Sequence, residues 1–139
     1  MQTFLPYRSF SRTMRVLDDR RLGKQRVEAR QILNALGGKS RGWRNHPAVL
    51  MWSGHEPSLR LYLRCAIREW RRRGFRNTMR LPRRDQCSRS KPSWLTREFV
   101  ETHRSNLVRK DPVYYGRYWA TPPDLPYLWP VRSAAAPSR

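Results

Sequence analysis

The sequence predicts an all-α fold: a single compact domain of three to four main helices, with an extended N-terminal arm and an irregular aromatic, proline-rich C-terminal tail. In several segments, apolar residues recur at the three- and four-residue spacing of one helix face. Serine, aspartate or proline precedes these segments, and glycine follows three of them. No segment shows the strict alternation of a β-strand, and the sequence contains no internal repeat.

The N-terminal quarter is expected to contain the arm and two helices. Pro6 interrupts residues 1–7, which should form the extended arm. A short helix should follow, with a serine as its N-cap and an apolar residue at its end: Ser9 or Ser11, and Val16 or Leu17. The second helix should cover Asp19–Leu36, with Asp18 near its positive N-terminal end and Gly37-Gly38 as its stop.

The middle of the chain is expected to contain a basic loop and two further helices. The loop covers Lys39–His46. Pro47 should open a short apolar helix that ends at Trp52, because proline is favoured in the first helical turn. A third main helix should begin at Glu56 and end in the basic run 71–75, whose glycine provides a C-terminal stop.

The C-terminal part begins with a second basic loop. Residues 76–91 contain six Arg or Lys and few apolar residues, so they should form a loop near the ligand. Pro92-Ser93 should open a last main helix that runs to about Val108. A compact aromatic turn is expected at residues 111–116. Beyond it, repeated prolines exclude regular secondary structure.

The chain is therefore divided into a helical domain, residues 1–116, and an irregular tail, residues 117–139, whose last residues, 134–139, should be frayed. No stretch reaches about 18 apolar residues, so no membrane-spanning helix is expected. Cys65 and Cys87 are too few for a disulfide scaffold or a zinc site, and we expect neither a metal nor a cofactor. These features predict a cytoplasmic protein, nucleoid-associated if bacterial, that acts as a monomer.

The charge of the chain points to a polyanionic partner. Thirty Lys and Arg stand against ten Asp and Glu, which gives a net charge of +20. Only four of the cations are lysines, and guanidinium groups bind phosphate oxygens through two parallel hydrogen bonds. Double-stranded DNA is the expected partner. A membrane surface is the weaker alternative, because no basic amphipathic anchor or lipidation motif is present.

The helix expected over Asp19–Leu36 places a lone carboxylate, Glu28, among cations. Its apolar residues form one stripe: Leu22, Ala29, Ile32, Leu33 and Leu36. Arg21, Lys24 and Glu28 lie together on one flank of that stripe. On an isolated helix this spacing favours a solvated ion pair between Glu28 and Lys24 or Arg21. In a chain that binds DNA, it also fits a reaction that needs an amine and a carboxylate.

Other catalytic classes lack their sequence signals. No nucleophile–base spacing of a serine or cysteine triad, no phosphate-binding glycine loop and no cluster of carboxylates for two metal ions is present. An amine nucleophile has two sources, the α-amino group of Met1 and the side chain of Lys24. An α-amino group is partly neutral at physiological pH, whereas the pKa of a lysine must be lowered by several units before its amine is neutral. Residues 1–7 span up to about 20 Å, enough to reach the Glu28 helix. Met1 is therefore favoured over Lys24.

Ordered sequence blocks resemble the pyrimidine-dimer DNA glycosylase family (the phage endonuclease V-like enzymes), and the opening Met-Gln-Thr-Phe-Leu-Pro-Tyr resembles a bacterial branch of it. The resemblance covers nearly the whole chain to Gly116 and rests mainly on four blocks: residues 22–28, 47–55, 72–75 and 111–116. It implies a compact helical fold and a bifunctional glycosylase and abasic-site (AP) lyase of base excision repair. In such an enzyme an N-terminal amine attacks the sugar C1′ of a damaged pyrimidine nucleotide, most often in a pyrimidine dimer.

The resemblance also suggests the site residues. Glu28 falls on the catalytic glutamate, which stabilises the cationic sugar and moves protons. Met1 supplies the amine, and Lys24 is the alternative nucleophile or a phosphate contact. Residues expected to contact DNA with a damaged base or an abasic site are Gln2, Arg20, Arg21, Gln25, Arg26, Arg44, His46, Arg71, Arg72, Arg73, Tyr114 and Tyr115.

The chain departs from the family pattern at three positions. Gln2 is too large for ordinary removal of Met1, so the terminal amine should belong to Met1 instead of residue 2. Val27 stands where the family has an arginine, and Arg21 aligns with its upstream histidine. A non-catalytic basic nucleic-acid-binding protein is the alternative function, because it explains the charge. It gives no reason for a carboxylate beside the binding surface, where it would repel phosphates.

Overall fold

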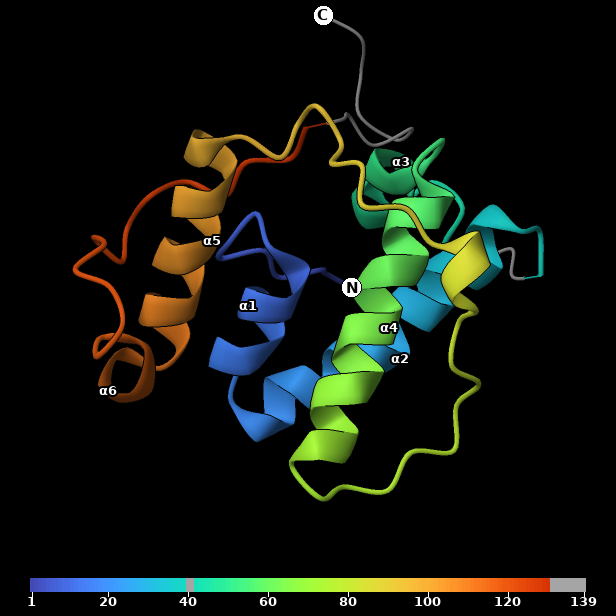
Figure 1. Cartoon of the computed structure of the whole chain (residues 1–139). Helices are drawn as coiled ribbons and strands as arrows, with labels where there is room; N and C mark the ends of the chain where they lie inside the picture. Colours follow the sequence, from blue (N-terminus) through green and yellow to red (C-terminus); the bar gives the residue numbers. More distant parts are fainter. Residues whose placement is uncertain (40–41, 131–139) are drawn as a thin grey trace, which may run out of the picture.

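The computed structural model describes residues 1–39 and 42–130. Within them the chain forms six α-helices and one short 3-10 helix, without a strand: α1 (Phe10–Val16), α2 (Asp19–Leu36), α3 (Pro47–Trp52), α4 (Glu56–Arg72), η1 (Arg84–Gln86), α5 (Arg97–Lys110) and α6 (Pro112–Tyr115). The all-α prediction is confirmed. In Figure 1, α4 crosses in front of α2, while α1 and then α5 lie to one side of it. No helix in this part of the chain is long and apolar enough to cross a membrane.

The pair α2 and α4 forms the centre of the fold. Each helix buries one stripe of mainly apolar residues: Leu22, Gln25, Ala29, Ile32 and Ala35 on α2, and Leu59, Tyr62, Leu63, Ala66 and Ile67 on α4. A Cβ atom on Gly23 would lie only 3.0 Å from the Trp70 ring. The glycine therefore lets α2 approach the end of α4 closely.

The predicted helix starts of α1 to α4 are confirmed, because local capping chemistry sets them. Ser9 accepts a hydrogen bond from the amide of Arg12, and Asp18 accepts one from the amide of Arg21. Proline occupies the first turn of both α3 and α4. After α4, Gly74 adopts a φ of 92°, a backbone conformation that favours glycine and ends the helix.

The predicted start of the last main helix at Pro92-Ser93 is wrong. The amide of Leu95 bonds the carbonyl of Pro92, and Thr96 then caps α5 by accepting from the amide of Phe99. The indole of Trp94 donates to the carbonyl of Met51 at 2.9 Å, which holds the turn against α3. Thus Pro92 opens a turn, and α5 begins at Arg97 and continues to Lys110.

The N-terminal arm has the predicted non-helical form, but it runs through the core. Residues 3–6 are buried, and side chains from three helices, α2, α4 and α5, satisfy backbone groups of three of them. Gln25 and His103 accept from the amides of Phe4 and Leu5, each at 2.9 Å. Further bonds to the arm come from Tyr62 to the Phe4 carbonyl, from Arg104 to the Pro6 carbonyl and from the Trp52 indole to the Thr3 hydroxyl. This network fixes the start of the chain in one place.

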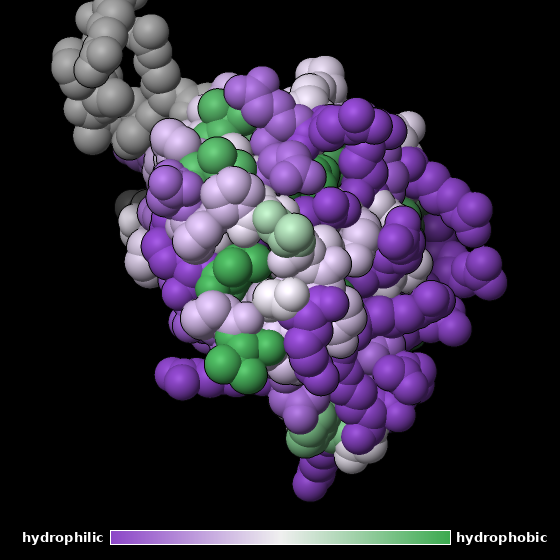
Figure 2. All heavy atoms as spheres, turned by 90° about the vertical axis from the view of Figure 1, so that its left-hand side faces the viewer, coloured by the Kyte–Doolittle hydropathy of each residue, from purple (hydrophilic) through white to green (hydrophobic). Residues whose placement is uncertain are grey.

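The described part of the tail, residues 117–130, packs against α5 and returns to the arm. Trp119 is buried and stacks on Tyr115, with ring centroids 5.8 Å apart. Farther along, the amide of Leu125 donates to Ser105 of α5 at 3.0 Å. The division of the chain after Gly116 stays a prediction, and the expected fraying of residues 134–139 lies outside the described residues. Figure 2 views the face over α5 and α6, where separate hydrophobic side chains lie among mainly hydrophilic ones.

Candidate active site

A cavity of about 320 Å³ lies where the arm meets one flank of α2. Seven residues expected at the site from the sequence line it, together with Phe4 and Lys110: Met1, Gln2, Arg20, Arg21, Lys24, Gln25 and Glu28. We call this cavity the Glu28 pocket. Arginine and lysine form much of its wall, and Glu28 is the only carboxylate that lines it within residues 1–39 and 42–130. The pocket therefore combines one acid with a surface that attracts phosphates.

The Glu28 carboxylate is held by the arm and not by cations. It accepts hydrogen bonds from the backbone amide of Gln2 at 3.3 Å and from the side-chain amide of Gln25 at 3.1 Å. Neither Lys24 nor Arg21 forms an ion pair with it in the described part of the chain; Arg21 pairs with Asp18 at 3.1 Å instead. The ion-pair interpretation of Glu28 is therefore wrong.

Gln25 links the carboxylate to the core. Its side-chain oxygen accepts from the Phe4 amide at 2.9 Å and from the Tyr62 hydroxyl at 2.6 Å, while its nitrogen donates to Glu28. Gln25 is fully buried, so the structure places it behind the carboxylate and not on an exposed surface of the pocket. The apolar stripe gave no signal for this role, because Gln25 replaces an apolar residue within it.

Met1 lines the Glu28 pocket, and its α-amino group is near enough to His46 for its charge to act on that side chain. The amide of Gln2, one residue along, bonds Glu28 directly. Burial and, to a smaller extent, the positive charge of the N-terminus lower the pKa of His46. The His46 side chain caps α3 by accepting from the Ala48 amide at 3.0 Å. The Gln2 side chain lies on the same side of the pocket, within hydrogen-bonding reach of the Tyr127 phenol.

The tail supplies aromatic residues that the sequence analysis did not assign to the site. The Tyr127 ring lies 5.0 Å from the ring of His103 and 4.7 Å from that of Trp129. The rings of Trp129 and His46 are arranged edge to face, with their centroids 6.0 Å apart. Burial raises the pKa of the Tyr127 phenol, the Gln2 side chain opposes this shift, and the charge of Glu28 adds to it. The tail thus reaches the amine side of the Glu28 pocket, which local sequence signals do not reveal.

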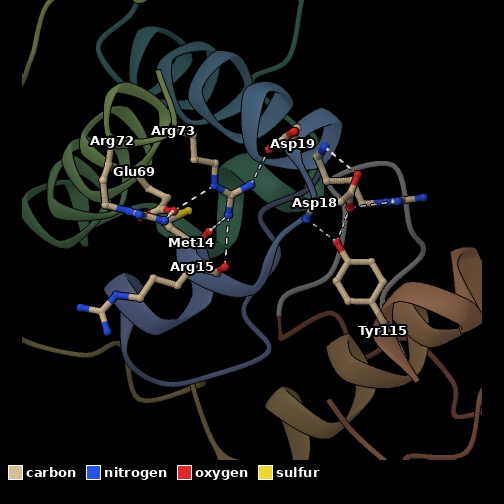
Figure 3. Close-up of polar contacts among 9 residues, drawn as sticks. Met14, Arg15, Asp18, Asp19, Glu69, Arg72, Arg73 and Tyr115 are labelled. Carbon is tan, nitrogen blue, oxygen red and sulfur yellow. Dashed lines mark hydrogen bonds and ion pairs between the residues drawn. The ribbon is translucent and has the colours of Figure 1, made fainter. Parts of the chain in front are cut away.

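Arg73, one of the expected DNA contacts, is largely buried and bonds groups of the protein itself. Its guanidinium bonds the carboxylates of Glu69 and Asp19, each at 2.9 Å. It also donates to the carbonyls of Met14 and Arg15, and Figure 3 shows these four contacts converging on it. Arg73 therefore joins the ends of α1 and α4 to the start of α2.

Two further residues that were expected to contact DNA also bond or pack within the protein, and those DNA contacts stay predictions. Tyr115 is fully buried and exchanges hydrogen bonds with Asp18, also drawn in Figure 3. Arg26 lies over the Trp70 ring at 4.5 Å and donates to Asn77 at 2.6 Å, away from the Glu28 pocket. Both side chains serve packing between helices.

The remaining predicted contacts lie outside the Glu28 pocket. Arg44 and Arg71 are exposed, Arg72 pairs with Glu69 at 2.6 Å, and Tyr114 is half-buried. Burial and a hydrogen bond with Tyr118 raise the pKa of Tyr114 to about 12, so its hydroxyl stays protonated. These groups, if they bind DNA, do so at a distance from Glu28.

Comparison with known proteins adds independent evidence. The family model described as pyrimidine dimer DNA glycosylase matches residues 1–82, more than half of the chain, and the match includes Met1, Lys24 and Glu28. No curated protein and no solved structure matches the chain. The bacterial branch stays a prediction. From the match over residues 1–82, the chain belongs to the pyrimidine dimer DNA glycosylase family.

Proposed function

We propose that this DNA glycosylase also cleaves the DNA strand, through a Schiff base between the Met1 α-amino group and the sugar of the damaged nucleotide. The observation that carries the proposal is the hydrogen bond from the Gln2 amide to Glu28, which keeps the chain's own amine beside the carboxylate of the pocket. The buried arm supports it, because a nucleophile must be held close to its target.

In the proposed reaction, the neutral amine nitrogen attacks C1′, and the bond from C1′ to the base breaks with its electron pair leaving on the base. Loss of the amine proton and opening of the sugar ring give the imine. Removal of a proton from C2′ then expels the 3′ phosphate by β-elimination, which cuts the strand 3′ to the lesion. Glu28 stabilises the cationic sugar and carries protons in these steps.

Lys24 is retained as the alternative nucleophile or as a phosphate contact. It is exposed and lines the same pocket, four residues before Glu28 on α2. No side chain in the described part of the chain orients its amine, whereas hydrogen bonds from several helices fix the arm that carries Met1. This difference favours Met1.

Borohydride trapping tests the proposal. The enzyme is incubated with duplexes that carry a cyclobutane dimer, an abasic site or an alkylated base, then reduced, and the adduct is mapped by mass spectrometry. We expect an adduct at Met1 on the dimer and abasic duplexes. Attachment at Lys24 would overturn the choice of amine, and no adduct on any duplex would overturn the Schiff-base mechanism and leave a glycosylase without lyase chemistry.

The variant Glu28→Gln separates binding from chemistry. It keeps the shape of the side chain and removes its charge, so the affinity for damaged duplex should persist or increase while base excision falls by at least about a hundredfold. Glu98→Gln, the same substitution at an exposed glutamate of α5 outside the pocket, is the matched control and should keep normal excision rates. Full activity of Glu28→Gln in a gel-based excision assay would end the assignment of Glu28.

A further inference from the structure

A second and larger cavity, of about 520 Å³, lies between α1, the outer face of α4 and the loop around η1. Six arginines line it: Arg15, Arg64, Arg68, Arg72, Arg84 and Arg89. We call it the arginine cavity. It shares no lining residue with the Glu28 pocket.

Hydrogen bonds hold the loop wall of the arginine cavity against α4. Arg64 donates to the carbonyl of Pro82 at 2.7 Å, and Arg60 donates to the carbonyl of Gln86 at 3.2 Å. The amide of Ser88 donates to the carbonyl of Pro57 at 3.0 Å. The three bonds come from successive parts of the loop, so the cavity is a built feature of the fold and not a gap beside a loose segment.

The charge in the arginine cavity is not balanced. Glu69 is the only acidic residue that lines it, and bonds to Arg72 and Arg73 occupy both of its carboxylate oxygens. The other five lining arginines form no ion pair within residues 1–39 and 42–130. Figure 3 shows the Arg15 side chain extending away from the Glu69–Arg73 contacts. Cations gathered in this way repel one another, and a bound anion would relieve the repulsion.

The arginine cavity and the Glu28 pocket lie against different faces of α4. Tyr62, on the inner face of α4, bonds Gln25 beside Glu28. Leu61, Arg64 and Arg68, which line the arginine cavity, are turned away from Tyr62 by roughly 100° to 160° about the helix axis. The two sites therefore face different directions, and we expect a straight duplex to reach only one of them at a time.

We propose that the arginine cavity is a second phosphate-binding site, which takes the phosphodiester backbone of a DNA segment other than the one at Glu28. Guanidinium groups bind phosphate oxygens in pairs, and arginines from α1, α4 and the loop are spread over a half-open cavity. Because the arginines are distributed over the cavity and not gathered at one point, they fit several phosphates along a DNA backbone better than they fit a single small anion. The enzyme then bridges two DNA segments and passes from one to the other without complete release.

A bridging assay tests this site. A lesion duplex is immobilised, the enzyme is bound to it, and capture of a fluorescent undamaged duplex is measured. The variant Arg68→Gln/Arg89→Gln removes two exposed charges of the cavity, and Arg76→Gln/Arg97→Gln removes two exposed charges elsewhere. We expect the first variant to lose capture about tenfold at fixed salt, since counterion release scales with phosphate contacts. The control should stay within about twofold of the wild type. Equal losses in both variants would overturn the proposal.

The two cysteines give a second, local readout. Cys65 and Cys87 are free, are the only cysteines of the chain, and both line the arginine cavity. Excess undamaged duplex should slow their alkylation in the enzyme already bound to a lesion duplex, and Arg68→Gln/Arg89→Gln should abolish this protection. Protection by millimolar inorganic phosphate but not by a second duplex would assign the cavity to a small anion and overturn the DNA proposal.

The test is independent of the Schiff-base chemistry. The proposal relies on the proposed function only for the lesion duplex at the Glu28 pocket. Glu28→Gln should therefore still capture the second duplex even though it no longer excises the base. Loss of capture in this variant would contradict two separate sites, whereas loss of excision alone leaves the second site intact.

Discussion

At the scale of single residues, His103 shows how burial alone changes a titration. It lies in the core, accepts from the amide of Leu5, and its other ring nitrogen has no partner among the described residues. Burial lowers the pKa of His103 from 6.5 to about 3. The imidazole is therefore neutral when the chain folds, and it can act as an acceptor for the arm.

This shift predicts a pH dependence of stability. Below about pH 6.5 the unfolded chain binds a proton that the folded chain does not, so the free energy of unfolding falls as the pH drops towards 3. The full effect is on the order of 4 kcal/mol. Urea unfolding between pH 4.5 and 7 should measure it. The lowered carboxyl pKa values of Asp18 and Glu69 contribute stability that is lost as the pH falls below about 5, so they add to the slope only at the acid end of this range.

His103→Gln provides the control for this dependence. The glutamine oxygen can accept the bond from the Leu5 amide, and the side chain does not titrate. We expect the variant to lose most of the change in unfolding free energy between pH 4.5 and 6.5. If the variant keeps the wild-type pH slope, another group must cause it.

Arg73 and Arg71 form a second residue-scale comparison on one helix end. Arg73 is largely buried and bonded to two carboxylates and two carbonyls, whereas Arg71 is exposed. Arg73→Ala leaves Glu69 without half of its partners and should lower the free energy of unfolding by about 3 kcal/mol. Arg71→Ala should change stability by less than about 0.5 kcal/mol. Chemical denaturation of both variants tests this, and equal effects would show that the Arg73 contacts are not stabilising.

At the scale of elements, the contact between α2 and α4 depends on Gly23. Alanine inside a helix normally stabilises it by about 1 kcal/mol relative to glycine. Here the added Cβ would lie 3.0 Å from two carbons of Trp70. Trp70 is stacked on Phe75 at 4.2 Å and donates to the carbonyl of Arg76, so it cannot easily move. Gly23→Ala should therefore cost about 1–3 kcal/mol, measured by thermal or urea unfolding.

A double-mutant cycle identifies the cause. In a Trp70→Leu background the steric conflict is absent, so Gly23→Ala should there be neutral or stabilising. A loss of the same size in both backgrounds would show that the cost of Gly23→Ala does not come from contact with Trp70.

The helices also show which of their starting residues can be predicted from the sequence and which cannot. Helix starts with a local cap, such as Ser9, Asp18 and Pro47, were predictable because the capping atoms lie within a few residues of the helix. The start of α5 was not, because Pro92 opens a turn that Trp94 holds against α3. A proline followed by a serine can open either a helix or a turn, and the local sequence is the same for both. Only the contact of Trp94 with α3 decides that Pro92 opens a turn.

The residues of the candidate site likewise fall into those that the sequence predicts and those that it does not. Met1, Lys24 and Glu28 were predicted from charge spacing and resemblance, and the structure brings them to one pocket. Gln25 and Tyr127 act through hydrogen bonds or ring contacts with residues 21 or more positions away, so no local pattern indicates them. Conversely, charge and composition predict DNA contacts at Tyr115 and Arg73, because neither distinguishes a buried ion pair or hydrogen bond from an exposed polar group.

At the scale of the whole molecule, the residues that hold the site in place extend beyond the residues that match the family. The family model covers residues 1–82, which include the Glu28 pocket apart from Lys110. Yet the arm that carries the amine is held from α5 by His103 and Arg104. The part of the chain beyond the match therefore positions the proposed nucleophile.

Truncation tests the predicted division of the chain after Gly116. A chain that ends at Gly116 lacks Trp119, which is buried against Tyr115, and Tyr127, which lies against His103. If residues 1–116 form a domain, this chain should still unfold cooperatively, with an unfolding free energy lower by at least about 3 kcal/mol. Trp119→Ala in the full chain should reproduce most of that loss, whereas Tyr127→Ala should mainly reduce excision, because it uncovers the amine side of the pocket. Failure of the truncated chain to fold would show that the helices and the tail form one unit.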